Sequence, residues 1–474
     1  MRIGTNVAAI VANNALQKSQ NNLSTSIQRL SSGYKINGSK DDAAGCAISE
    51  KMRAQIRGLS QAQNNTADGV SVLNTAEGAI TEIQSMLTRL KELSVQAAND
   101  VNSDDEREAI QKEIEQINNE IDRISDQTEF NTQSLINGNL SRRVYSDLQG
   151  VNQLSVSDSY TAGVYGITVT EDARQAIAIG AGSITMSSTA SITEEQAGAI
   201  NINGYKISIS EGDTLDKVMG KIIDGVNITG GSAFTVKDLN NDTAANGTDY
   251  AGYVPTADYA GSTLVIMTNQ YGSDQKMNIT CDNAELADIL GIPQAATQDG
   301  IYVEGSDVKA EIATGDDGKR IGFADSAILS TKGTVITVTD VNNKEFSMDV
   351  PGNAAGTVFD DSNNDGQSVA GAGTARTISQ EVTDVGTMSI HVGANQDQVI
   401  VIDIPAITTY SLGTEHMNVM TQYTASRAIS TVDEAINKTN KIRSRIGAYE
   451  NRFDHTTNCL LYTSPSPRDP KTSR

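Results

Sequence analysis

Residue types that usually carry out chemistry are few in this sequence. No H-E-x-x-H spacing joins the three histidines, which lie far apart in different predicted elements: His391, His416 and His455. The three cysteines are too few and too scattered for a disulfide framework or a thiolate zinc site. Neither a G-x-x-x-x-G-K-S/T phosphate loop nor a G-x-S-x-G nucleophile elbow is present. We therefore predict that the chain is not an enzyme and has no catalytic, cofactor-binding or metal site.

One segment matches the first half of a calcium-binding loop. Asp361–Gly366 offers carboxylate and amide oxygens at the spacing that such a loop uses. Its twelfth position, however, is Ala372, where a bidentate glutamate is needed. We interpret the segment as a flexible acidic loop.

The net charge limits the possible partners. Lys and Arg number 36 and Asp and Glu number 59, which gives a formal charge of −23. Such a chain is repelled by nucleic acid and by anionic membranes. No apolar stretch approaches the ~20 residues that span a bilayer, and the N-terminus makes a poor secretory signal. We therefore predict no nucleic-acid partner and no membrane insertion, and either an intracellular location or export without a cleavable signal.

The elements that could position functional residues begin with helices. A set of apolar residues recurs largely at three- and four-residue steps, which predicts a narrow apolar stripe on a polar helix: Val7, Ile10, Leu16, Leu23, Ile27 and Leu30. A loop at 31–38 follows, with two glycines and an asparagine. Periodicity then resumes and predicts a long helix from about residue 43 to residue 98.

The next helix has the clearest pattern in the sequence. Ser103 is its expected N-cap, and three acidic residues follow where the helix dipole favours negative charge. Its apolar residues alternate in steps of four and three, which is a heptad seam: Ile110, Ile114, Ile117, Ile121 and Ile124. The turn before Ser103 is short, so this helix is expected to fold back antiparallel on the preceding one.

The middle of the chain differs in texture, and the C-terminal part is helical again. Short β-branched runs at 165–170, 205–209, 264–267, 334–338 and 399–404 predict strands, and one short helix is expected at 214–223. A second seam follows between residues 414 and 458: Ile429, Val432, Ile436, Ile442, Ile446, Tyr449 and Phe453. The predicted fold class is α+β, with a long antiparallel helical bundle or coiled-coil rod from both termini and an inserted β-rich middle region.

Several motifs resemble bacterial flagellin, the subunit of the flagellar filament. The specific ones are Leu30–Asn37, Lys40–Gly45 and Ile48–Leu59, and shorter matches follow at 93–99, 120–124 and 451–453. In the middle, Ile202–Tyr205 with Asp213–Leu215 is similar to a small βαβ module often inserted in flagellins. The resemblance covers about 140 N-terminal and 45 C-terminal residues well, and the middle in patches.

The resemblance implies a division of the chain into five parts. Residues 1–42 would be the filament-core helix, 43–140 and 411–458 the two parts of the rod, and 141–410 a variable β-rich surface region with a βαβ module near 199–292. The core helix is expected to be disordered in the monomer, because a narrow apolar face without a partner cannot offset its ordering entropy. Residues 459–474 are expected to be an artefactual tail, because the seam stops and proline takes over.

The resemblance also implies the biology of a filament subunit. Flagellins are secreted through the flagellum's own type III export apparatus, assemble with copies of themselves into an extracellular helical homopolymer and support swimming motility. Without the C-terminal part of the family, this chain is expected to stay monomeric and to lack the export-chaperone site. Flagellins of the activating kind are sensed by a vertebrate Toll-like receptor, and the family positions correspond to Arg89, Leu93, Gln96 and Glu113.

Two other interpretations remain open at this point. A hook–filament junction protein shares the terminal helices with flagellin, although the Lys40–Gly45 and Ile48–Leu59 motifs favour flagellin. The β-rich middle could also carry an adhesive or an enzymatic function, since some flagellins hold a hydrolase insertion. Residues 141–410 lack a His/Glu zinc spacing, which argues against the enzymatic version.

Overall fold

The structure is a computed structural model of the chain. It describes residues 6–157, 160–180, 182–236, 259, 261–292, 300–315, 318–340, 344–352, 354, 359–360, 369–370, 375–383 and 385–463, so the calcium-like segment Asp361–Gly366 lies outside it. The chain forms two compact units. Unit 1 contains Met1–Leu73, Ser389–Val401 and Ala448–Arg474, and unit 2 contains Asn74–Met388 and Ile402–Gly447.

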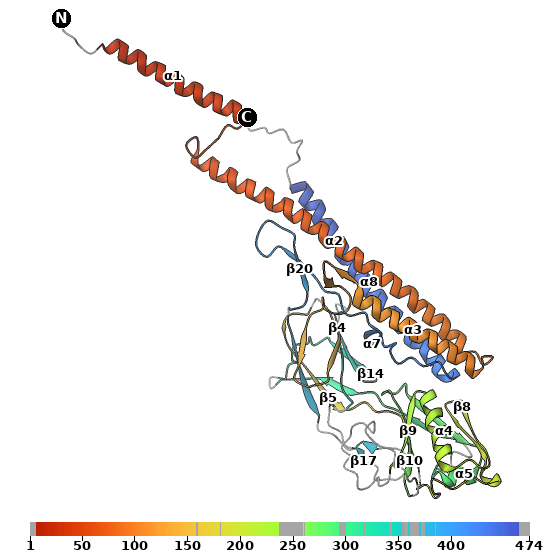
Figure 1. The fold of residues 1–474 in the computed structure, drawn as a ribbon. Coiled ribbons are helices and arrows are strands. Elements are labelled where there is room, and N and C mark those ends of the chain that lie inside the picture. Colours follow the sequence, from red (N-terminus) through yellow and green to blue (C-terminus); the bar gives the residue numbers. More distant parts are fainter. Residues whose placement is uncertain are drawn as a thin grey trace. The chain divides into compact units, whose positions relative to one another are not determined.

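Unit 1 is mainly helical. Helix α1 (Val7–Ser32) begins where the Asn6 side chain accepts a hydrogen bond from the Ala9 amide, and it ends at Gly33, whose φ of 71° only glycine adopts easily. A loop joins it to α2 (Ala43–Ala97), as Figure 1 shows. The first part of α2 packs against the last part of α8 (Gln422–Thr463), since a Cβ added at Gly69 would lie 3.0 Å from the Phe453 ring.

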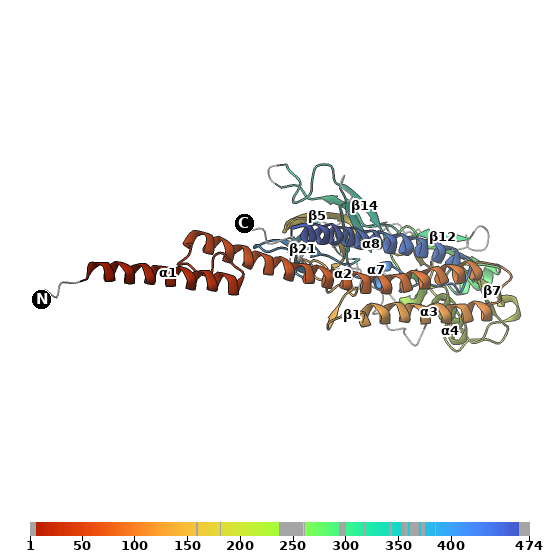
Figure 2. The same ribbon diagram turned by 90° about the horizontal axis from the view of Figure 1, so that it is seen from above.

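Three helices lie side by side in unit 2 (Figure 1 and Figure 2): the later part of α2, α3 (Asp104–Gln127) and the first part of α8. The bounds of α2 agree with the predicted helix at 43–98. The predicted cap of α3 is confirmed. Ser103 Oγ accepts from the Glu106 amide, and the Glu106 carboxylate accepts from the Ser103 amide, which completes a capping box.

The C-terminal helix differs at both ends from its predicted range of 414–458. A short helix, α7 (Thr409–Leu412), ends at Gly413 with a φ of 84°, and α8 starts only at Gln422. The delay has a local cause, because the Thr421 and Thr424 hydroxyls each accept a hydrogen bond from the other residue's amide and so fix a helix start there. At the other end α8 continues through Thr463, and Leu460 is buried.

Two four-stranded antiparallel sheets in unit 2 share one hydrophobic core, which includes Ile167, Ile378, Ile336 and Phe346. One sheet has the order β13 (Lys309–Ile312), β5 (Gly163–Glu171), β19 (Arg376–Val382), β3 (Val144–Ser146). The other has the order β14 (Ile328–Lys332), β15 (Val335–Thr339), β16 (Glu345–Asp349), β4 (Asn152–Val156). Aromatic rings fill the space between them: Tyr160, Tyr165, Phe323 and Phe346.

A second core in unit 2 surrounds helix α4 (Leu215–Ile228) and helix α5 (Ala284–Ile289). One sheet beside them has the order β12 (Ile301–Glu304), β11 (Lys276–Cys281), β7 (Gly198–Ile202), β8 (Tyr205–Ile209). Another has the order β6 (Ile177–Ile179), β10 (Thr263–Thr268), β9 (Gly231–Val236). The order β8–α4–β9 is the expected strand–helix–strand sequence, but its two strands belong to different sheets. A short 3₁₀ helix, η1 (Glu194–Gln196), precedes β7.

Three two-stranded sheets complete the described strands: β1 (Glu129–Phe130) with β2 (Gln133–Ser134), β17 (Phe359–Asp360) with β18 (Val369–Ala370), and β20 (Met388–His391) with β21 (Val399–Ile402). The structure therefore confirms helices near both ends of the chain and a β-rich middle. A continuous coiled-coil rod and the five predicted domain boundaries remain predictions.

Candidate functional site

Helix α1 carries an unusual apolar surface. None of its residues is buried, and its large apolar side chains range from 49% exposed at Ile10 to 87% exposed at Leu30. Because successive residues of an α-helix turn by about 100°, Leu16, Leu23, Ile27 and Leu30 share one face. Val7, Ile10 and Val11 point to the opposite side. The predicted single stripe is thus two apolar patches on opposite faces, and such surfaces mark contact sites.

The loop after α1 explains one of the sequence motifs physically. Asp41 accepts the Asn37 amide at 3.0 Å, and Asp42 accepts the Gly45 amide at 3.0 Å, which caps the start of α2. A Cβ at Gly45 would lie 2.6 Å from the Asp42 carboxylate and 2.9 Å from Ile36 Cδ1, so a larger residue would require both side chains to shift. These contacts fix the chain between the two helices. Just beyond them α2 exposes three more apolar side chains: Ile48, Met52 and Ile56.

The α3 seam lies in contact with the rest of unit 2. Ile114 and Ile121 are 0% exposed and Ile110 is also buried, whereas Ile117 and Ile124 are half-buried. On α8 the buried members of the second seam are Val432, Ile446, Tyr449 and Phe453, and the half-buried ones are Ile429, Ile436 and Ile442. The two seams therefore contain both core residues and residues at the edge of the core.

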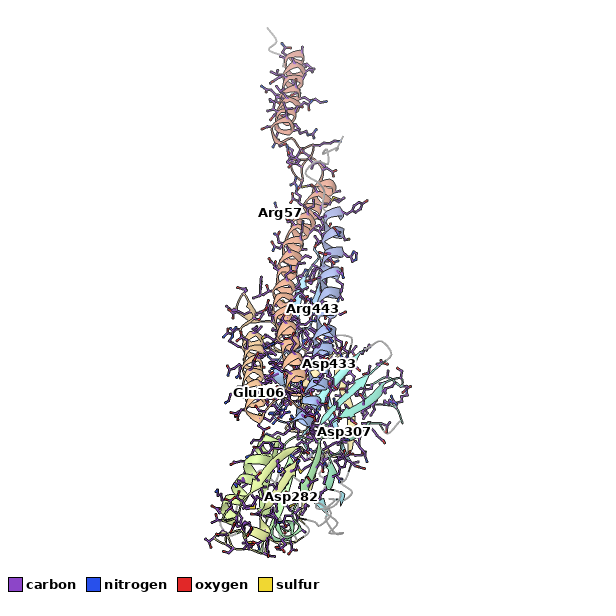
Figure 3. The ribbon with its side chains drawn as sticks, turned by 90° about the vertical axis from the view of Figure 1, so that its right-hand side faces the viewer. Arg57, Glu106, Asp282, Asp307, Asp433 and Arg443 are labelled. Atoms are coloured by element: carbon purple, nitrogen blue, oxygen red, sulfur yellow. The ribbon has the colours of Figure 1, made fainter. Side chains whose placement is uncertain are left out.

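Charged pairs join α2 to α8 inside unit 2. Lys91 on α2 lies 2.6 Å from the Asp433 carboxylate, and Arg443 lies 2.7 Å from the Glu77 carboxylate and also donates to Gln84. Figure 3 labels Asp433 and Arg443 along α8. These side chains are 31–46% exposed, so each pair contributes at most about 1 kcal/mol. Their value lies in setting the register of the two helices.

Polar residues of α3 hold α7 and the segment between α7 and α8. The Asp122 carboxylate accepts from both the amide and the hydroxyl of Thr409, at 2.8 and 2.6 Å. Asn118 donates to the Thr414 carbonyl at 2.9 Å, and the Gln111 side chain bonds to both Met417 and Val419. Sequence reasoning missed these three residues. The signal for one of them was a polar side chain, Asn118, between two isoleucines of the seam.

The residues that the resemblance assigned to receptor contact do not share one environment. The Arg89 guanidinium donates to Glu113 at 2.8 and 3.0 Å and to Glu92 at 3.1 Å, and these hydrogen bonds raise its pKa. Arg89, Gln96 and Glu113 are exposed. Leu93, in contrast, is 1% exposed and belongs to the helix interface. It therefore offers no side-chain surface to an external partner in this conformation.

The part of the chain that the structure describes has neither a cluster of metal ligands nor a membrane-spanning helix. Within those residues, no group of three or more His, Cys, Asp or Glu side chains could hold a metal ion. No described helix is both long enough and apolar enough to cross a membrane.

Comparison with known proteins gives consistent matches. The family model for the bacterial flagellin N-terminal helical region matches residues 3–141. The flagellin of Salmonella typhimurium strain LT2 is 30% identical over 477 residues, which cover 95% of this chain and 87% of that protein. The flagellin of Clostridium tyrobutyricum is 38% identical over 239 residues, covering 44% of this chain and 63% of that protein.

Solved structures give a weaker comparison. The structure of FliC from Burkholderia pseudomallei is 13% identical to this chain, with 81% of this chain and 99% of that one covered. Its TM-score of 0.24 supports no argument about the fold.

Proposed function

The chain belongs to the bacterial flagellin family, and from this we propose that it is a structural, non-enzymatic subunit of the flagellar filament. It assembles through its terminal helices with other flagellin subunits, is located outside the cell and supports swimming motility. The observation that carries the proposal is the contrast within its helices. The seams of α3 and α8 are largely buried inside the chain, whereas α1 exposes apolar residues on two opposite faces.

The two apolar faces of α1 fit a helix that contacts more than one neighbour. Burying a leucine or isoleucine side chain stabilises a complex by roughly 1.5–3 kcal/mol. The set Leu16, Leu23, Ile27 and Leu30 alone therefore supplies a large driving force for association, and Val7, Ile10 and Val11 supply a second contact. We propose that α1 fluctuates in the free subunit, because none of its residues is buried by the part of the chain that the structure describes, and becomes ordered on assembly.

Seeded polymerisation tests this proposal. Purified protein is mixed with short flagellar filament seeds, and polymer is collected by ultracentrifugation. We expect the wild-type protein to enter the pellet and the Leu23→Asp variant to remain in the supernatant, because the charge lies in the centre of one apolar face. Ser26→Asp, whose side chain lies between the two apolar faces of the same helix, is the matched control and should pellet normally.

Two outcomes would count against the proposal. Wild-type protein that stays soluble at every concentration in the presence of seeds would contradict assembly, whereas solubility without seeds is what the sequence predicts for this chain. A hook–filament junction protein would bind at seed ends in a fixed amount without elongating them, so a pellet that saturates at one subunit layer would favour that alternative.

The middle region is proposed to form the outer surface of the filament. Residues 141–410 hold 14 basic and 35 acidic side chains, so most of the net charge of the chain lies there. A surface of this kind repels other filaments and keeps them dispersed. The 31–46% exposed ion pairs between α2 and α8 would in this arrangement stabilise the inner, helical part.

Recognition by a vertebrate Toll-like receptor is proposed on the exposed members of the earlier set. Arg89, Gln96 and Glu113 remain candidates, whereas Leu93 would contribute only by packing. We expect Arg89→Ala to weaken binding of the receptor ectodomain at least tenfold in surface plasmon resonance. Arg123→Ala, which removes an exposed arginine paired with Glu120 on α3, is the matched control. Equal affinity of all three proteins would contradict the mapping.

Export through the flagellum's own type III apparatus is proposed as the route to the filament. A cell that lacks this apparatus should accumulate the protein inside, while a cell that lacks only the general secretory signal pathway should still release it. Detection by immunoblot of culture supernatants separates the two. Release from the apparatus-deficient strain would contradict this route.

A further inference from the structure

Two adjoining cavities in unit 2 are not used by the proposed assembly. The first has a volume of about 380 Å³ and the second about 480 Å³, and both are lined by Asn203 and Lys276. Ligand sites commonly measure a few hundred Å³. Their combined walls come from the β7–β8 turn, β11 and the segment around residues 413–431. The Asn418 amide donates to the Ile228 carbonyl at 2.9 Å and fixes that segment against α4.

Asn203 is the fixed point between the two cavities. It has a φ of 51°, a backbone conformation that few residues other than glycine and asparagine adopt. Its side chain donates to the Lys276 carbonyl at 3.2 Å and accepts from the Asn278 amide at 2.8 Å, and its own amide donates to the Asn278 carbonyl at 2.9 Å. The shared wall is therefore rigid before any ligand arrives.

The first cavity is lined by three tyrosines, Tyr205, Tyr302 and Tyr423, and also by the charged residues Asp100, Asp104, Arg107 and Lys276. The Tyr302 ring is held in place on one side, because its hydroxyl donates to Glu304 at 2.6 Å and the Lys276 ammonium lies 5.6 Å from its centroid. Lys276 is itself paired with Glu304 at 2.7 Å. Tyr302 is nevertheless 53% exposed. The Tyr302 ring therefore offers flat apolar surface with little entropy to lose on binding, and the half-buried Tyr205 and Tyr423 extend the wall.

The second cavity is rich in side-chain amides and carries positive charge. Among the described residues that line it, the titratable ones are Lys276, His416 and Arg427, whereas acidic residues such as Asp274, Glu415 and Glu434 line a neighbouring cavity that shares Arg427. The Arg427 guanidinium has no hydrogen-bond or ion-pair partner among the residues that the structure describes. Gln275 donates to Gln270 at 3.0 Å, which leaves a free amide donor on Gln270 and a free acceptor on Gln275 among the described residues.

We propose that the two cavities form one binding groove for an acidic oligosaccharide. The apolar face of one sugar ring packs on the tyrosines of the first cavity, and the carboxylate of the next sugar pairs with Arg427 in the second. Arg427 suits this role because a guanidinium binds a carboxylate through two parallel hydrogen bonds. The free amide atoms of Gln270 and Gln275 suit hydroxyl groups, which both donate and accept.

A polyhydroxyl ligand explains the lining better than a simple anion or a peptide. A small anion would use only Arg427 and would not need the rings of the first cavity. An acidic peptide would need backbone partners in a regular row, such as a free strand edge, and the cavity walls are lined mainly by side chains. The groove lies outside α1, so this inference and the proposed filament function can fail independently.

Isothermal titration calorimetry with the full chain tests the proposal. The probes are digalacturonic acid and its neutral counterpart, a galactose disaccharide with the same linkage. We expect the wild-type protein to bind both, with the acidic sugar bound at least fivefold more tightly. Arg427→Gln should abolish this preference and leave the affinity for the neutral sugar unchanged, and Tyr302→Ala should weaken both at least fivefold.

Controls separate ring packing from loss of fold. Tyr302→Phe keeps the ring and removes the hydroxyl, so it should bind both probes within twofold of the wild type. Arg376→Gln, an exposed arginine on β19, is the matched control for Arg427 and should change nothing. Thermal melting of each variant verifies that it is folded.

Three results would overturn the proposal. The first is no heat from either sugar at a probe concentration of about 10 mM, which corresponds to less than roughly 3 kcal/mol of binding free energy. The second is an equal loss of both sugars in Arg427→Gln. The third is tight binding of a Glu-rich peptide at Arg427 in the absence of any sugar binding, which would assign the groove to a protein partner.

Discussion

Helices α1 and α3 are built by similar rules and have opposite surroundings. Both start at a polar cap, Asn6 in one and Ser103 in the other, and both place isoleucine or leucine at helical spacing. Yet Ile114 and Ile121 on α3 are 0% exposed, whereas α1 has no buried residue. An apolar pattern therefore determines which face of a helix is apolar, but it does not determine whether the residues that cover this face lie in the same chain.

The partner of α3 lies in the same chain. Its seam packs within unit 2, and Asp122, Asn118 and Gln111 tie it to the segment at 409–419. Helix α1 makes no comparable tertiary hydrogen bond among the described residues, and its cap and its end are local. Folding of unit 2 should therefore depend on α3 and be indifferent to α1.

The largest expected effect comes from truncating one apolar residue in each helix. Ile114→Ala should lower the free energy of unfolding by about 3 kcal/mol, because it removes buried methyl groups and leaves a cavity. Leu23→Ala should change it by less than about 0.5 kcal/mol, since that side chain is already in water. Urea denaturation followed by circular dichroism measures both. Equal losses would show that α1 packs on the rest of the monomer.

The next largest loss of stability is expected from a substitution at Asp122, the α3 residue that binds Thr409. Asp122→Asn keeps one oxygen to accept from the Thr409 amide and turns the other into a donor, to which the Thr409 hydroxyl must become the acceptor, so both hydrogen bonds lose their charge assistance. We expect a loss of about 2 kcal/mol, because hydrogen bonds to a charged group are among the stronger ones. Asp126→Asn, one turn further along α3 with an exposed side chain, serves as its control. If both variants were equally stable, the hydrogen bonds from Thr409 to Asp122 would make no contribution to the free energy of unfolding.

Local signals in the sequence predicted much of this difference. The bounds of α2 followed from apolar periodicity, and the Ser103 cap followed from the acidic residues behind it. The strand at 205–209 was predicted at its full length from β-branched alternation. Each of these features is decided within a few residues of chain, where propensity and capping dominate.

Features decided by distant residues were not predictable. The start of α8 depends on the Thr421–Thr424 pair, which competes with a pattern that would allow an earlier start. The burial of Leu93 depends on where neighbouring helices lie. In the candidate sugar groove, Arg427 and Asn203 are more than two hundred residues apart, and no spacing rule connects them. Which distant residues come into contact in the folded chain therefore cannot be predicted from local sequence patterns.

Smaller changes in stability are expected from substitutions at the N-caps of the two helices, Ser103 and Asn6. Ser103→Ala removes the hydrogen bond to the Glu106 amide and half of the capping box, and it should cost about 1 kcal/mol of global stability. Asn6→Ala should leave the global free energy unchanged, because α1 is not part of the cooperative unit. It should instead lower the helical content of the free protein slightly. A matching loss of global stability in Asn6→Ala would mean that α1 and unit 2 unfold together.

The smallest change in stability is expected at a buried polar group, the Tyr160 hydroxyl. The Tyr160 hydroxyl is buried, and no described residue bonds to it. Burial, assisted by the negative charge of Asp340, raises the pKa of Tyr160 to about 12, above the ordinary tyrosine value of about 10. Tyr160→Phe keeps the ring among Tyr165, Phe323 and Phe346 and removes the orphan hydroxyl. We expect a gain of about 0.5 kcal/mol near neutral pH.

The stability difference between Tyr160→Phe and the wild type should depend on pH. The unfolded state releases the Tyr160 proton near pH 10 and the folded state only near pH 12, so the wild-type protein loses stability as pH rises through this interval. Tyr160→Phe lacks that loss, and its advantage over the wild type should grow between about pH 8 and about pH 11. Urea midpoints at both values measure it. A stability advantage of Tyr160→Phe that does not change with pH would show that the Tyr160 hydroxyl has a hydrogen-bond partner in solution.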